Sequence, residues 1–129
     1  MKIKKEVSYA IKALKYLYIA DTVSTADSIS KNEQIPVNFL YPILRKLSNS
    51  KIIEIKRGIH GGYIISKNIL NLSLYDIICI IDKPLSINTL CEDNSNCIYV
   101  NDCKILNEFN RIENILIKEL KKVPLVDLF

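Results

Sequence analysis

The sequence predicts a mainly α-helical fold with one small β-hairpin wing. Three observations support this: apolar residues recur at helical spacing in several segments, one glycine-containing stretch alternates β-branched with charged residues, and a long amphipathic segment lies near the C-terminus. The 129 residues suffice for one compact domain with an appended element. We therefore expect a winged helix-turn-helix domain followed by a long C-terminal dimerisation helix.

Three helices are expected in the first fifty residues. The first, residues 7–20, has an apolar stripe with lysines off the stripe. A short second helix follows Thr25, whose side chain can cap it, and extends to residue 31. After a polar turn, Pro36 pre-sets the start of a third helix over residues 37–49. A short helix, a tight turn and a second helix with polar residues outward form a helix-turn-helix.

The third helix is the candidate for the element that enters the major groove of DNA. Pro42 lies inside it, where a proline removes one hydrogen bond and clashes with the carbonyl of Asn38, costing about 3 kcal/mol unless the helix kinks. We therefore expect a bend or a late start in this helix. The residues of this helix that we expect to contact DNA are Asn38, Phe39, Tyr41, Arg45 and Lys46.

A β-hairpin is predicted over residues 52–66, where two runs rich in isoleucine flank a glycine-containing loop. A hairpin directly after a helix-turn-helix is a wing, and its glycines let the backbone approach a duplex closely. The wing residues that we expect to contact DNA are Arg57, Gly58, His60 and Gly61. For His60, an exposed loop histidine without a DNA contact is the alternative.

The charge is distributed unevenly along the chain. Residues 1–67 hold twelve Lys and Arg against five Asp and Glu, a net charge of +7, whereas residues 68–129 hold six against nine, a net charge of −3. Localised positive charge favours a polyanion such as nucleic acid, because binding releases counterions. A solvated lysine-rich face is the alternative explanation of the charge.

A short helix through residue 82 is predicted after Ser73, which with Asp76 forms a capping box. Cys79 lies in this apolar helix, and we interpret it as a structural cysteine instead of a metal ligand. Pro84 then ends the helix.

Three cysteines follow in a short polar segment: Cys91, Cys97 and Cys103, with five residues between neighbours. Such crowding suits thiolates that converge on one soft metal centre. Three unrelated thiols or a chance disulfide are the alternatives. No apolar run approaches the ~20 residues that cross a bilayer, so we expect a cytoplasmic protein with no membrane partner, in which thiols stay reduced.

The last helix is predicted from Cys103 to about residue 122, with a tail, PLVDLF, that packs on the body or on a partner. Cys103 at the helix start lies where the macrodipole favours a thiolate. The apolar stripe is close to a coiled-coil seam, and we interpret it as a homodimer contact; packing on the chain's own core is the alternative. The dimerisation residues are Ile105, Phe109, Ile112, Leu116 and Leu120.

The whole chain resembles the Rrf-type winged-helix transcription regulators. The wing KRGIHGGYII, with Arg57, Gly58, Gly61, Gly62 and Tyr63, is the most diagnostic match. The cysteine spacing is that of cluster-binding members. The other matching segments are MKIKKEVSYAIKAL, IPVNFLYPILRKL, LSLYDIICIID and VPLVDLF.

This resemblance implies a homodimer that binds a roughly palindromic DNA operator, with an iron-sulfur cluster on Cys91, Cys97 and Cys103. The sequence departs from the family at the fourth ligand. Leu106 stands where some members have a histidine, and Ser8 where others take a carboxylate from the first helix of the second subunit. Cluster type and signal therefore stay open.

The leading hypothesis is a DNA-binding transcription regulator that is controlled by the cluster, with repression as its expected role. Its parts are a winged helix-turn-helix domain (1–83), a cysteine loop (84–103) and a dimerisation helix with its tail (104–129). A metal-free thiol switch, or a winged module that docks on a partner enzyme, are the alternatives. The chain is not expected to be an enzyme, because its single histidine and lack of paired carboxylates assemble no acid-base site.

Overall fold

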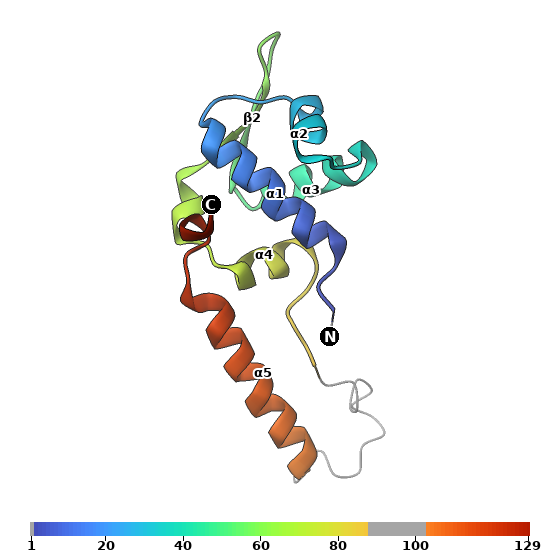
Figure 1. The fold of residues 1–129 in the computed structure, drawn as a ribbon, viewed down its shortest axis with the longest axis vertical. Helices are drawn as coiled ribbons and strands as arrows, with labels where there is room; N and C mark the ends of the chain where they lie inside the picture. Colours follow the sequence, from blue (N-terminus) through green and yellow to red (C-terminus); the bar gives the residue numbers. More distant parts are fainter. Residues whose placement is uncertain (1, 88–102) are drawn as a thin grey trace.

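The computed structural model describes residues 2–87 and 103–129. Figure 1 shows a helical body from which the hairpin projects at one end and a long helix at the other. The chain order within the described residues is α1 (Lys5–Ala20), α2 (Ala26–Glu33), α3 (Val37–Asn49), β1 (Ile53–Lys56), β2 (Gly62–Ile65), η1 (Lys67–Asn71), α4 (Leu74–Ile81), α5 (Lys104–Lys122) and η2 (Leu125–Leu128). The predicted fold class is confirmed.

One hydrophobic core joins α1, α3 and α4. Because apolar residues recur every three or four positions in these helices, each helix turns a continuous apolar face inward. The buried face of α1 carries Val7, Ala10, Ala13, Leu14 and Leu17. The buried face of α3 carries Leu40, Ile43, Leu44 and Leu47.

The turn between α2 and α3 is fixed at both ends. The Thr25 hydroxyl accepts a hydrogen bond from the Ser28 backbone N–H at 3.2 Å, which confirms the predicted cap of α2. Gln34 ends α2 in the left-handed region (φ 54°), and the next residue, Ile35, is buried with 2% of its surface exposed. The Ser30 hydroxyl donates to the Ile35 carbonyl at 2.6 Å. These contacts set the path of the chain from one helix to the next.

The third helix occupies the predicted residues. Pro36 is the residue that caps α3, and the helix begins at Val37 and ends at Asn49 with Pro42 inside it. The expected late start is therefore wrong, because the chain is already helical five residues before the proline. Pro42 lies on the exposed side of the helix, opposite the leucine face, where its ring displaces no core side chain.

The two strands form an antiparallel hairpin, in which Ile53 pairs with Ile65 and Lys56 with Gly62. Strand β2 is also tied to the segment before α2, because Ser24 and Tyr63 exchange two backbone hydrogen bonds of 2.8 Å. The predicted wing is thus anchored on the helical body through β2, and its tip projects beyond the body (Figure 1).

The C-terminal tail folds back onto the body as η2. Leu125 is fully buried, and its backbone N–H donates to the Leu72 carbonyl at 2.7 Å. The ring of Phe129 lies 5.6 Å from that of Tyr18. Packing of the tail on the body, one of the two expected arrangements, is confirmed, whereas neither η1 nor η2 was predicted as a helical turn.

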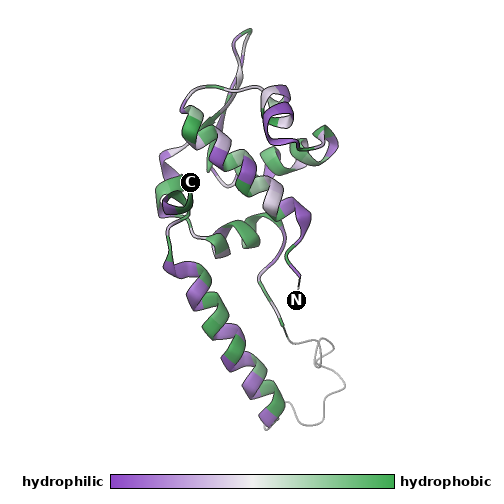
Figure 2. Cartoon of the chain, viewed as in Figure 1, coloured by the Kyte–Doolittle hydropathy of each residue, from purple (hydrophilic) through white to green (hydrophobic). Residues whose placement is uncertain are grey.

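Helices α4 and α5 are as expected at their starts. Ser73 and Asp76 form the predicted capping box at α4. Helix α5 begins after Cys103, and none of its 19 residues is buried, although it contacts α4. Figure 2 shows apolar and polar residues alternating along it. Within the described ranges, no helix is long and apolar enough to span a bilayer.

Replacement of Pro42 by alanine is expected to stabilise the fold by about 1–3 kcal/mol, because the new N–H can donate to the Asn38 carbonyl and the ring clash disappears. Urea unfolding followed by circular dichroism measures the change. Arg45→Ala, at an exposed position of the same helix, is the control and should stay within about 0.5 kcal/mol of the wild type. An unchanged urea midpoint of unfolding for Pro42→Ala would show that Pro42 does not destabilise the fold.

Candidate nucleic-acid interface and cysteine segment

All five residues that were predicted to contact DNA from α3 lie on its exposed side. The large side chains among them are only partly solvent-accessible, with 38% of Phe39 and 48% of Tyr41 exposed. The opposite face of α3 is fixed in the core, so these side chains have a defined direction. A helix with polar, aromatic and basic groups on a rigid outer face is suited to reading base edges in a major groove.

Two of these residues also contact other helices. The Phe39 ring lies 5.8 Å from the ring of Tyr9 on α1, which braces it against the body. The Lys46 ammonium donates to the Ile81 carbonyl in the last turn of α4 at 2.7 Å. A cation near the last carbonyls of a helix is favourable. Sequence reasoning missed this bond because its partners are 35 residues apart.

The wing residues lie around the hairpin tip. Arg57, Gly58 and His60 are exposed and Gly61 is half-buried. The Gly61 N–H donates to the Gly58 carbonyl at 3.0 Å, which closes a tight turn. The structure therefore presents the predicted contacts on two separate elements, the α3 face and the wing tip, as a winged helix-turn-helix requires.

Of the three clustered cysteines, only Cys103 lies within the described residues; Cys91 and Cys97 lie outside them. Cys103 is a free, half-buried thiol at the N-cap of α5, and its side chain makes no capping hydrogen bond. The Cys103 sulfur therefore accepts no hydrogen bond from the backbone of the first turn of α5.

Both ends of the cysteine segment are fixed on the same helix. The Ile87 N–H donates to a Glu113 carboxylate oxygen at 3.0 Å, and the chain re-enters α5 at Cys103. These two points on α5 are about 15 Å apart, since a helix rises 1.5 Å per residue. The fifteen residues 88–102 have a contour length of about 50 Å, so the chain has ample length to return two cysteines to Cys103.

The end of α4, which precedes the cysteine segment, is also tied to the N-terminal residues. The Lys4 ammonium lies 2.8 Å from a carboxylate oxygen of Asp82, and this hydrogen bond raises the pKa of Lys4. Among the described residues, no group of three His, Cys, Asp or Glu side chains could hold a metal ion. The predicted metal site depends on two residues outside them.

Helix α5 exposes much of its predicted dimerisation stripe. Ile105 is 61% exposed and Ile112 is 42% exposed, while Phe109, Leu116 and Leu120 are half-buried. Ile115, which was not among the predicted residues, is 50% exposed. The apolar surface of α5 is therefore wider than its contact with α4.

The remaining cysteine lies on α4. Cys79 is free and half-buried. A hydrogen bond with its side chain is the main cause that raises the pKa of the Tyr75 phenol. The Lys121 ammonium of α5 lies 5.0 Å from the centre of the same ring. Tyr75 is thus the residue that contacts α5, and the structural role of Cys79 stays a prediction.

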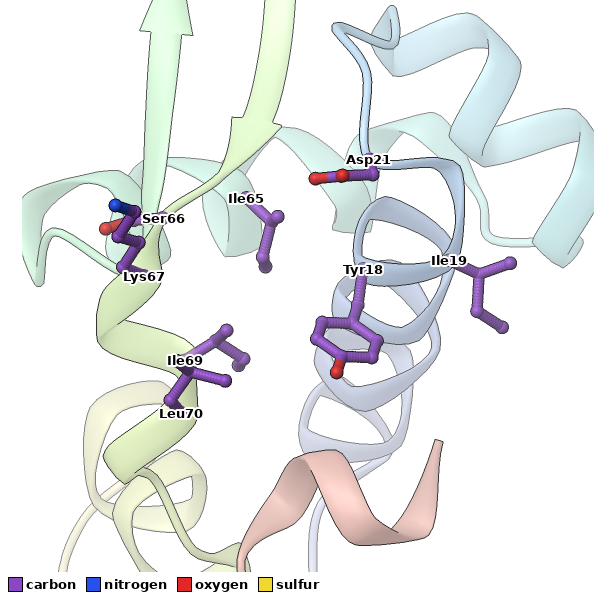
Figure 3. Close-up of a pocket in the computed structure, with 8 residues that line it drawn as sticks. All are labelled: Tyr18, Ile19, Asp21, Ile65, Ser66, Lys67, Ile69 and Leu70. Atoms are coloured by element: carbon purple, nitrogen blue, oxygen red, sulfur yellow. The ribbon is translucent and has the colours of Figure 1, made fainter.

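A surface pocket of about 630 Å³ lies between the end of α1 and η1 (Figure 3). Its lining is a mixture of polar and apolar groups, and none of the predicted DNA-binding, metal-binding or dimerisation residues lines it. The lining residues are Tyr18, Ile19, Asp21, Ile65, Ser66, Lys67, Ile69 and Leu70.

A helix-turn-helix with an exposed reading helix and a basic wing defines a DNA-binding transcription regulator. The chain belongs to the Rrf2 family, whose family model, described as an iron-dependent transcriptional regulator, matches residues 3–129. The expected family is thereby confirmed, as is the expectation that the chain is a regulator and not an enzyme.

Relatives and solved structures agree with this assignment. The chain is 31% identical over 88 residues to Rv1287 of Mycobacterium tuberculosis (strain ATCC 25618 / H37Rv), a proposed HTH-type transcriptional regulator; the match covers 67% of this chain and 55% of that protein. The chain thus spans about half the length of this relative.

Two solved structures share the fold. CymR, the global cysteine regulator of B. subtilis, has a TM-score of 0.78 at 21% identity, covering 99% of this chain and 95% of that one. IscR of T. potens has a TM-score of 0.74 at 16% identity, covering 99% of this chain and 85% of that one.

Arg57→Ala is expected to weaken binding to all DNA about equally and to lower the salt dependence by about one counterion, because an arginine at the wing neutralises phosphate. Asn38→Ala is expected to relax preference at one base pair, by about 1–3 kcal/mol. Fluorescence anisotropy with selected and random duplexes over a salt series measures both effects.

Lys122→Ala is the charge-matched control for Arg57→Ala, since Lys122 is exposed at the far end of α5. It should leave affinity and salt slope unchanged. Equal losses on selected and random DNA for Asn38→Ala would contradict its role in reading sequence.

Proposed function

We propose that the chain is a homodimeric, sequence-specific transcription regulator, acting as a repressor, whose DNA binding is modulated by an iron-sulfur cluster on Cys91, Cys97 and Cys103. The observation that carries this proposal is the attachment of both ends of the cysteine segment to α5, at Glu113 and at Cys103. The helix proposed to pair two subunits is therefore also the helix to which the described residues on either side of 88–102 attach.

The dimer proposal is supported by the unburied state of α5. A 19-residue helix with no buried residue and a strong apolar stripe gains little from its own chain. Ile105 and Ile112 are seven residues apart, the repeat of a two-stranded coiled coil, and both are exposed. Pairing with the same helix of a second subunit would remove these side chains from water.

Cys103 is the one predicted ligand within the described residues, and its thiol suits a soft metal centre. Cys103 offers a free thiol at a helix N-terminus, with no competing hydrogen bond from the cap. When bound, an iron-sulfur cluster supplies a redox-active centre that responds to oxidation or loss. Cys103 would be one ligand of this cluster, at the N-terminal end of α5.

A series of contacts links α5 with α3, the helix proposed to enter the major groove. Glu113 on α5 accepts from Ile87, the chain before Ile87 leads back to the end of α4, and Lys46 on α3 bonds Ile81 there. A change in the cysteine segment can therefore bias the position of α4 against α3. The energetic coupling expected for such a link is about 1–3 kcal/mol.

Protein purified without oxygen is expected to be coloured, with iron and sulfide in equal amounts, because reduced thiolates hold such clusters. The colour should vanish in a variant with Cys91, Cys97 and Cys103 all changed to serine. Visible absorption, with iron and acid-labile sulfide determined per chain, measures the outcome.

Cys79→Ser is the matched control, since this fourth cysteine lies in α4 and should leave the colour intact. A colourless, iron-free protein after anaerobic reconstitution would remove the cluster from the proposal. Loss of two free thiols on mild oxidation of that iron-free protein would favour the metal-free thiol switch.

Ile112→Asp is expected to convert the dimer to a monomer, because it places a charge in the seam of α5. Sedimentation velocity over a concentration series measures the assembly. Asn114→Asp adds the same charge at an exposed polar position of the same helix and should leave the dimer intact. A wild-type chain that stays monomeric at all concentrations would contradict the dimer itself.

A further inference from the structure

Among residues 2–87 and 103–129, the most exposed large apolar side chain lies at the wing tip. Ile59 has 99% of its surface in solvent, against 66% for Ile19 and 61% for Ile105. The apolar side chains of the β1 strand are at least partly covered, with Ile53 buried and Ile55 52% exposed. An isoleucine that protrudes completely forfeits the free energy of burial, so its side chain is available for a partner.

The backbone holds Ile59 at the apex of a closed turn. Ile59 and His60 are the two central residues of the turn that the Gly61–Gly58 hydrogen bond of 3.0 Å closes. Gly58 has a φ of 115°, and a Cβ at Gly61 would clash with the Lys56 carbonyl oxygen. Glycine is therefore required at both ends of the turn, which fixes Ile59 before any partner binds and reduces the entropy lost on binding.

The charges around this side chain identify the partner. Residues 56–62 include the cationic residues Lys56 and Arg57 and no acidic residue. The carboxylate of Glu54, farther down the strand, is paired with Lys56 at 3.4 Å. The wing tip thus has an apolar apex close to cationic side chains. This arrangement suits the minor groove of DNA, which is narrow and has apolar sugar walls between two rows of phosphates.

We propose that Ile59 is an apolar wedge that enters the minor groove beside the major-groove site of α3 and partly unstacks one base step. This inference rests on the proposed DNA-binding function and adds a residue that reads DNA by deformability. Apolar side chains between base steps unstack and kink a duplex, and pyrimidine–purine steps yield most easily. Ile59 would thus favour a flexible step where the wing makes no base hydrogen bond.

The test starts from a duplex that the wild-type chain selects from a random DNA pool. Ile59→Ala is expected to lose about tenfold in affinity for this duplex, with an unchanged salt slope, because Ile59 contacts no phosphate. Replacing the flexible flanking step by a stiff A-tract should weaken the wild type and leave Ile59→Ala unaffected. 2-Aminopurine at that step should brighten on binding of the wild type only.

Two variants keep the result specific. Ile59→Met retains an apolar wedge and should keep most of the affinity, whereas Ile19→Ala, at another exposed isoleucine that lies on α1 and not at the wing tip, should change nothing. Ile59 is fully exposed, so its substitution does not endanger folding.

The outcomes separate the two proposals. If the wild type selects a duplex and Ile59→Ala binds it within twofold of the wild type, the wedge is overturned while the DNA-binding function stands. If the wild type binds every duplex alike, sequence-specific binding fails, and the wedge fails with it. Tenfold loss with rescue by methionine supports the wedge.

Discussion

Burial of one face of α3 against α1 is the constraint on which the rest of the structure depends. Leu40, Leu44 and Leu47 are completely buried in that contact, and each buried leucine contributes about 1.5–3 kcal/mol. Because the same helix carries the candidate reading residues on its other side, the core that stabilises the fold also sets their direction. The wing and α4 are then positioned relative to α3, through β1 and through Lys46.

Periodicity and capping were sufficient to predict most of the fold from the sequence. The apolar spacing in residues 37–49 predicted α3 to the residue, and Ser73 with Asp76 predicted the start of α4. These signals are local, since each depends on residues within a few turns of one another. The two 3-10 turns escaped prediction because Leu72 and Leu125 meet only in the tertiary fold, 53 residues apart in sequence.

The candidate site was less completely predictable. Exposure of the polar residues Asn38, Arg45 and Arg57 followed from their character. The bond from Lys46 to Ile81 did not follow, because nothing near Lys46 in sequence marks its acceptor. The sequence did not mark Ile59 as exposed, because an apolar side chain is normally expected to be buried. Its complete exposure is a property of the closed turn, which only the three-dimensional fold shows. The ligand set at Cys91 and Cys97 rests on their spacing and on the family, since both lie outside the described residues.

Because the tail packs on the body, the two ends of α5 are held differently. At one end the helix runs into η2, where Leu125 is buried in the core, and at the other it ends at Cys103, about 29 Å away by the rise of a helix. A rigid rod held at one end is a lever with its fulcrum at the C-terminus. A small rotation at the fulcrum produces its greatest displacement at the sulfur-bearing tip, and a force at that tip acts on the body with the greatest torque.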